Sequence, residues 1–163
     1  MLIALVVCGA STIAGAAQPS AQAVFDQIKK LEGNWHSTTG KTAVNYALIA
    51  NGSSIVEAWT MSPTRQSMTG YTMDGDRMLA THYCPQGNAP RLYLADTEKD
   101  GSHHFEFLDG ANLQSRDGSH EHAFWIRLDL PDHLARSETY IANGSVYDPA
   151  KDLGEAESFA RVK

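Results

Sequence analysis

The residues best suited to chemistry in this sequence are histidines that alternate with apolar residues. His82 stands two residues before Cys84, and His120 and His122 precede Phe124 in the same alternation. Because side chains at i and i+2 of a β-strand point to the same face, each set would share one wall of a sheet. A Cys/His pair suggests nucleophilic catalysis, and two histidines at this spacing could share a metal ion if a third ligand were present.

The same spacing argues against both chemistries. Residues i and i+2 lie about 7 Å apart along a strand, which is too far for the hydrogen bond that would activate Cys84. We therefore interpret Cys84 as a small buried apolar residue. His82 is the best candidate for a polar group in a cavity, in competition with a core histidine that only bonds a neighbour. For His120 and His122, a position at a solvated rim is favoured over a metal site, because this spacing is common by chance.

Glu57 is a carboxylate that alternates with Ile55 and Trp59. If this face points inward, the carboxylate must be paired or have a raised pKa. With a histidine across the lumen it could then act as an acid/base pair or orient a ligand. If the face with Val56 and Ala58 points inward instead, Glu57 lies in solvent. Alternation alone does not decide between the two.

Several classes of function lack support in the sequence. There is no G-x-S-x-G, glycine-rich phosphate loop, H-E-x-x-H or C-x-x-C, so hydrolase, nucleotide-dependent and thiol-redox activities are not indicated. Thirteen Lys and Arg against nineteen Asp and Glu give a formal charge of −6, with no basic cluster. This balance excludes a typical nucleic-acid binder and argues against docking on an anionic membrane. A small neutral, apolar or metal-bearing partner fits better.

The elements that must position these residues are mostly strands. Residues 21–31 carry apolar side chains on a helical period and predict one short amphipathic helix. Ten strand-like runs follow, with turn signals about every eight to twelve residues. The connections are short and no crossover helix intervenes, so sequential strands should be antiparallel neighbours. The predicted strands span residues 35–39, 42–50, 54–61, 66–73, 77–84, 91–97, 103–108, 120–130, 133–142 and 158–162.

A meander of this many twisted strands closes on itself more readily than it stays open. The predicted fold is therefore all-β: an antiparallel up-and-down β-barrel of about ten strands with one short N-terminal helix. Asn51-Gly52 predicts a type I′ hairpin turn between the second and third strands.

The chain length of 163 residues indicates one domain behind a short leader. Residues 1–17 are uncharged and largely apolar and end in an A-x-A-like site, which is typical of a secretory leader. Cleavage after Ala17 would leave residues 18–163 as one barrel domain, periplasmic or secreted, with no membrane insertion. Cys84 would then be the single cysteine, so the fold must rest on its core without an internal disulfide. The sequence leaves the oligomeric state open.

Several motifs resemble known families. Residues 31–35 (LEGNW) resemble the G-x-W entry that opens the first strand of lipocalin-like (calycin) barrels after a short helix. Residues 57–61 (EAWTM), 71–84 (YTMDGDRMLATHYC) with 86–88 (QGN), and His122 with 131–134 (PDHL) are similar to a family of small exported bacterial proteins of unknown function. The resemblance implies a calycin-type barrel and implies no activity.

A more distant resemblance is to the haem-binding nitrobindin barrels, which also begin with G-x-W and use a histidine as axial ligand. In this chain Trp35 is followed by residues 36–39 (HSTT) instead of the glycines of nitrobindins, which argues against haem binding.

The barrel pattern with polar residues on apolar faces predicts an exported binding protein that holds a small, mostly apolar ligand in its lumen. The alternative is a haem or a divalent metal held by lumen histidines, or acid/base catalysis by Glu57 and a histidine. A structural or partner-binding role is the third hypothesis. The candidate ligand-binding residues are Glu57, Trp59, Tyr71, His82, Cys84, His120, His122 and Phe124.

Overall fold

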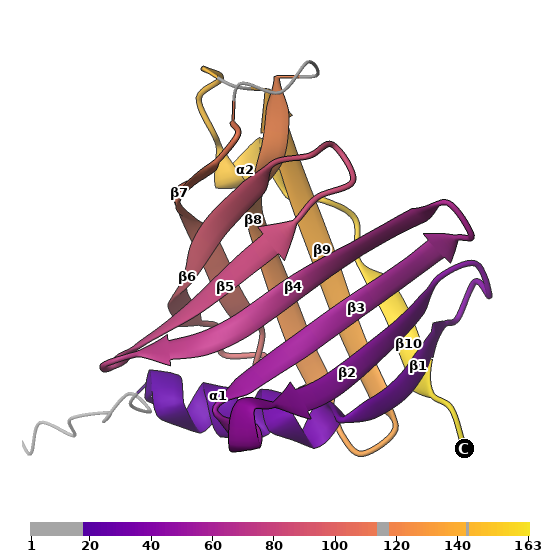
Figure 1. Ribbon diagram of the computed structural model, residues 1–163. Helices are drawn as coiled ribbons and strands as arrows, with labels where there is room; N and C mark the ends of the chain where they lie inside the picture. The colour runs from indigo at the N-terminus through magenta and orange to yellow at the C-terminus, as the bar shows by residue number, and fades with distance from the viewer. Residues whose placement is uncertain (1–17, 114–117, 143) are drawn as a thin grey trace, which may run out of the picture.

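Ten antiparallel strands close into a single barrel in which every strand pairs with its neighbours in chain order (Figure 1). The computed structural model describes residues 18–113, 118–142 and 144–163. The first strand pairs with the last, which completes the closure. The predicted all-β up-and-down barrel is therefore confirmed. The predicted leader, residues 1–17, lies outside the described residues.

All ten predicted strands are present, with ends within three residues of the predicted ends. One turn differs from its prediction. Ile49 pairs with Ser54, so a four-residue loop replaces the two-residue turn, although Asn51 and Gly52 adopt the expected positive φ values of 56° and 80°. The strands are β1 (Gly33–Ser37), β2 (Ala43–Ile49), β3 (Ser54–Ser62), β4 (Arg65–Asp74), β5 (Arg77–Tyr83), β6 (Ala89–Thr97), β7 (His103–Ala111), β8 (Ser119–Asp129), β9 (His133–Ala142) and β10 (Glu157–Arg161).

The N-terminal helix closes one end of the barrel. Helix α1 (Ala21–Ile28) begins at Ser20, whose side chain accepts a hydrogen bond from the backbone of Ala23, and continues as the 3-10 helix η1 (Lys29–Leu31). Val24, Phe25 and Ile28 are buried on its apolar face. Figure 1 shows α1 lying across the lower end of the barrel. No helix of the described residues is long and apolar enough to cross a membrane.

Arg161 on β10 contacts β1 and its neighbours at the end of the barrel that α1 covers. Its guanidinium lies 4.3 Å from the centre of the Trp35 ring. It also donates to the backbone oxygens of Lys30 and Glu32, at 2.8 Å each, and to that of Pro131 at 3.0 Å. These contacts hold η1 and the β8–β9 turn against β1, so this end of the barrel is sealed.

A segment outside the barrel covers part of β9. Between β9 and β10 the chain forms the short helix α2 (Pro149–Asp152), which was not predicted. Next to it, Gly154 accepts a hydrogen bond from Ser137 at 2.7 Å and donates one to Thr139 at 3.0 Å. Ser137 and Thr139 are therefore buried, although they alternate with residues that point into the barrel.

Candidate functional site

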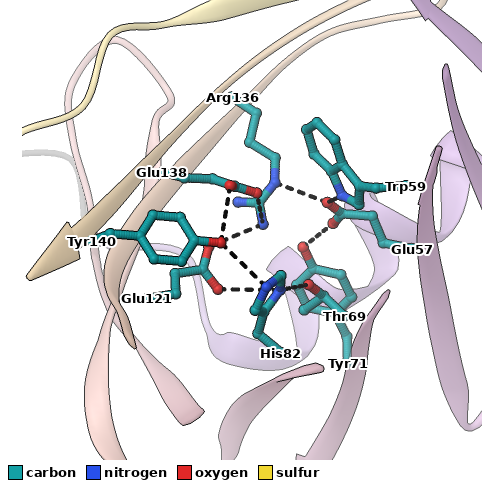
Figure 2. A network of polar contacts seen from close by, with 9 residues as sticks. All are labelled: Glu57, Trp59, Thr69, Tyr71, His82, Glu121, Arg136, Glu138 and Tyr140. Atoms are coloured by element: carbon teal, nitrogen blue, oxygen red, sulfur yellow. Dashed lines mark hydrogen bonds and ion pairs between the residues drawn. The ribbon is translucent and has the colours of Figure 1, made fainter. Parts of the chain in front are cut away.

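The barrel interior contains a guanidinium surrounded by three carboxylates (Figure 2). Arg136 on β9 is 1% exposed. Its Nε donates to Glu57 Oε1 at 2.8 Å, and its Nη2 lies 3.4 Å from Glu121 Oε1 and 3.3 Å from Glu138 Oε1. A buried charge must be paired, and these contacts pair it. We call the following residues the Arg136 network: Glu57, Trp59, Thr69, Tyr71, His82, Glu121, Arg136, Glu138 and Tyr140.

Glu57 points into the barrel, which settles the question that the sequence left open. Its carboxylate is fully buried and accepts hydrogen bonds from the Trp59 indole N–H and the Tyr71 hydroxyl, besides the one from Arg136. None of these partners is a histidine. The described contacts therefore do not join Glu57 to a lumen histidine, and the predicted acid/base pair stays a prediction: the charged partner of Glu57 is the guanidinium of Arg136.

Aromatic rings hold Arg136 in place. Its guanidinium lies 4.0 Å from the centre of the Phe124 ring and 5.3 Å from that of Trp59, both within the range of a cation–π attraction. Phe124 in turn stacks on Phe105 with ring centres 4.5 Å apart, and Tyr71 meets both rings edge-on. The polar network therefore rests directly on the apolar core, and Phe124 is part of its support.

His82 bridges the network through both ring nitrogens. Nδ1 lies 3.0 Å from Thr69 Oγ1 and 3.4 Å from Glu121 Oε2, and Nε2 lies 3.3 Å from the Tyr140 hydroxyl. Burial lowers the pKa of His82 to about 4, so the ring is neutral at pH 7. A metal ion or a haem iron would have to displace one of these partners before it could bind either nitrogen.

Glu121 corrects the predicted orientation of β8. Regular alternation places Glu121 on the face opposite His120, His122 and Phe124, which would be the outer face. In the structure Glu121 pairs with Tyr140, and Ala123 pairs with Thr139, which leaves His122 as the extra residue of a β-bulge. Glu121 and Phe124 consequently both point inward. Burial raises the pKa of Glu121 to about 7, and the charge of Arg136 limits the rise.

His120 and His122 belong to a different cluster. Their ring nitrogens are 3.1 Å apart, and both rings contact Phe107. The His122 ring also packs against Tyr147, with ring centres 4.8 Å apart. These two candidates therefore do not join the Arg136 network. Within residues 18–113, 118–142 and 144–163, no three His, Cys, Asp or Glu residues lie close enough together to hold a metal ion.

A cavity of about 430 Å³ opens at the end of the barrel opposite α1, near the turns that follow β3 and β5. Trp59, Glu138 and Tyr140 belong both to its wall and to the Arg136 network. Its remaining walls carry apolar, hydroxyl and amide side chains, with one arginine and one glutamate. It is lined by Thr42, Trp59, Met61, Arg65, Ser67, Cys84, Pro85, Gln86, Glu138, Tyr140 and Glu157.

Cys84 is half-buried at this cavity, whereas the sequence predicted a buried apolar residue. It follows the end of β5, and its backbone N–H bonds Asn88 across the turn, so the strand alternation that was used to place it no longer applies. Partial burial raises the pKa of the thiol, which opposes formation of a reactive thiolate.

The structure thus separates the predicted candidates into three groups. Trp59 and Cys84 line the cavity, and Glu57, Tyr71, His82 and Phe124 lie behind it, whereas the two histidines of β8 lie elsewhere. Sequence reasoning missed five members of the network: Thr69, Glu121, Arg136, Glu138 and Tyr140. A signal for three of them was present: Leu134 is a core residue, and alternation from it places Arg136, Glu138 and Tyr140 on the same inner face of β9.

No protein-family model matches this chain, and no curated protein is significantly similar to it. The fold itself defines the class: a closed ten-strand antiparallel up-and-down barrel, with helix α1 across one end and a cavity of about 430 Å³ at the other. Membership of an exported bacterial calycin family stays a prediction from the motifs.

Proposed function

We propose that this protein is a small-molecule carrier or sensor that binds an organic ligand in the open end of its barrel. The observation that carries the proposal is the cavity of about 430 Å³ whose inner wall is made by the Arg136 network. Its volume lies in the range of ligand sites, which run from about 300 to 1,000 Å³. With the predicted leader, binding would take place outside the cytoplasm.

The lining indicates a ligand with both an apolar and a polar part. Trp59, Met61 and Pro85 offer apolar surface, while Glu138 and Tyr140 offer a carboxylate and a hydroxyl at the inner wall. We refine the mostly apolar ligand predicted from the sequence accordingly. A ligand that buried only hydrocarbon against Glu138 would remove solvent from the carboxylate and leave it only its two 3.3 Å contacts, with Arg136 and Tyr140.

The network supports binding because it fixes the inner wall before a ligand arrives. Glu138 contacts Arg136, and the Tyr140 hydroxyl contacts both Glu138 and His82. Side chains locked by such second partners do not need to be ordered on binding, which lowers the entropic cost of association.

The test is native mass spectrometry of the protein purified gently from its own host, in three forms. Ser67→Trp places bulk on the cavity wall, and Thr72→Trp places the same bulk on the exposed outer face of the same strand, β4. We expect a co-purifying mass on the wild type and on Thr72→Trp that is lost from Ser67→Trp. A wild-type protein with no bound mass, or a mass that survives in Ser67→Trp, contradicts the proposal.

A second candidate function is acid/base catalysis, favoured by one observation. A carboxyl group whose pKa is about 7, such as Glu121, can both give and take a proton at neutral pH. His82 and Tyr140 link it to the cavity. Binding remains the first proposal because Glu121 itself does not line the cavity. If the bound compound were converted to a product, Tyr140→Phe would abolish turnover while leaving binding within a few-fold; unchanged turnover would exclude this relay.

A further inference from the structure

Acidic side chains outnumber basic ones around the cavity. Among the described residues, three ionisable side chains of Asp, Glu, Lys or Arg line it, namely Arg65, Glu138 and Glu157. Behind its inner wall lie Arg136 with Glu57 and Glu121. Together these are two guanidiniums and four carboxyl groups, and His82 adds no charge at pH 7 because burial keeps its pKa near 4. Burial raises the pKa of Glu121 to about 7 and also raises that of Glu138, so these two groups are the ones able to gain negative charge when a cation binds nearby.

Arg136 cannot serve as the counter-ion of an anionic ligand. It does not line the cavity, its Nε is committed to Glu57, and its Nη2 is shared between Glu121 and Glu138 at more than 3.2 Å. Its Nη1 has no hydrogen-bond partner among the described residues, but this atom is buried behind the wall. The group that a ligand meets at the inner wall is the Glu138 carboxylate. Among the described residues, Arg65 is the only arginine or lysine that lines the cavity, and it is exposed to solvent on β4 next to the β3–β4 turn.

Glu138 has unused capacity to accept hydrogen bonds. Its side chain is 27% exposed, and both described contacts are long: 3.3 Å to Arg136 Nη2 and 3.3 Å to the Tyr140 hydroxyl. An ionised carboxylate has about four acceptor sites, and short charge-assisted bonds measure about 2.7–2.9 Å. Trp59 and Tyr140 border the same wall, and aromatic rings attract cations.

From these observations we propose that the ligand is an organic amine, whose protonated amino group binds Glu138 while its apolar part packs against Trp59 and Met61. This inference rests on the proposed function and adds the chemical class of the ligand. Burial raises the pKa of Glu138 in the free protein, and a bound ammonium group would lower it again. Binding should therefore release a proton and become tighter as the pH rises through the raised pKa of Glu138.

The experiment uses three probes of nearly equal shape: 2-phenylethylamine, 2-phenylethanol and 3-phenylpropanoate, which are cationic, neutral and anionic at pH 7. Their affinities are measured by isothermal titration calorimetry in two buffers of different ionisation enthalpy. We expect the amine to bind at least ten-fold more tightly than either other probe, with a heat that differs between the buffers because a proton is released.

Two variants locate the effect. Glu138→Gln should bring the affinity of the amine down to that of the alcohol and leave the alcohol unchanged within about two-fold. Glu157→Gln removes a half-buried carboxylate from the start of β10. It should lower the affinity of the amine by less than about three-fold, because charges that keep contact with solvent interact weakly.

The outcomes separate this inference from the proposed function. If the alcohol or the anion binds as tightly as the amine, or if the preference for the amine survives in Glu138→Gln, the ligand class is wrong while the pocket still binds. If none of the three probes binds at millimolar concentration, the amine class is contradicted, and the binding function is contradicted as well only if the wild type also carries no co-purifying mass.

Discussion

Arg136 is the residue on which the interior of the barrel depends. A buried ion pair adds little net stability, but removing one partner leaves an uncompensated buried charge. Glu57 and Glu121 are both fully buried, and both have Arg136 as their cationic partner in the described residues. Loss of the guanidinium would therefore leave two buried carboxyl groups without their cationic partner.

We predict that Arg136→Met lowers the free energy of unfolding by about 3–5 kcal/mol, the range for breaking a buried pair. Urea denaturation at pH 7 measures it. Arg77→Met is the control, because Arg77 pairs with Asp74 on the surface and both side chains are more than half exposed. This variant should lower the free energy of unfolding by less than about 1 kcal/mol. Equal losses in the two variants would show that the interior pair is solvated.

Glu121 and His82 should act on stability with opposite signs. Glu121 keeps its proton in the folded state up to about pH 7, whereas the unfolded chain loses it near pH 4.5. The contribution of Glu121 to the free energy of unfolding therefore falls as the pH rises between these values. The pKa of His82 falls from 6.5 to about 4, so the unfolded chain binds the extra proton and the contribution of His82 rises with pH in that window. The two effects oppose each other between about pH 4.5 and 6.5.

Glu121→Gln should therefore expose the effect of His82. Relative to the wild type, its free energy of unfolding should rise by up to about 1.4 kcal/mol per pH unit from pH 4.5 to 6.5. His82→Gln should show the opposite slope relative to the wild type. Urea denaturation curves at several pH values provide the measurement, and variant curves that run parallel to the wild type would contradict the assigned pKa values.

At the scale of elements, the packing of the 153–156 segment on β9 positions the inner wall. A Cβ on Gly154 would lie 1.9 Å from the backbone oxygen of Glu138, closer than real side-chain contacts. Only glycine allows this approach, so the segment sets the position of the strand that carries both Glu138 and Arg136.

Gly154→Ala should consequently destabilise the fold by about 1–3 kcal/mol through overpacking, and it should weaken binding of a probe at Glu138. Gly70→Ala on β4 is the matched control, because nothing lies within 4 Å of the added Cβ; its stability should stay within about 0.5 kcal/mol of the wild type. Thermal denaturation compares the two variants. An unperturbed Gly154→Ala would mean that the segment does not pack on β9 as described.

The bulge in β8 marks the limit of what alternation predicts. Ten strands, their order and the helix follow from turn signals and from periods of two and 3.6, because these patterns are local. The orientation of Glu121 depends on one unpaired residue, His122, which the sequence does not mark. Alternation along β9 does place Leu134 and Arg136 on the same face. Which carboxyl groups surround the guanidinium depends instead on how the strands pair, and a local pattern does not contain this information.

At the scale of the whole molecule, the barrel has one sealed and one open end. Helix α1 and the Arg161–Trp35 contact close the first, and the cavity opens at the second. The three tryptophans report on different places: Trp35 at the sealed end, Trp59 at the cavity, and Trp125 on β8, opposite the outward-facing Ser137. Ligand binding should therefore be visible at one indole in particular.

The most direct test of the binding function is the ¹H–¹⁵N spectrum of these three indole N–H groups, before and after the co-purifying ligand is removed by denaturation and refolding. We predict that the Trp59 signal moves, since its N–H is bonded to Glu57 beside the cavity, while the Trp35 signal stays unchanged. A Trp59 signal that does not move, or a change confined to Trp35 or Trp125, would contradict a ligand site at the open end of the barrel.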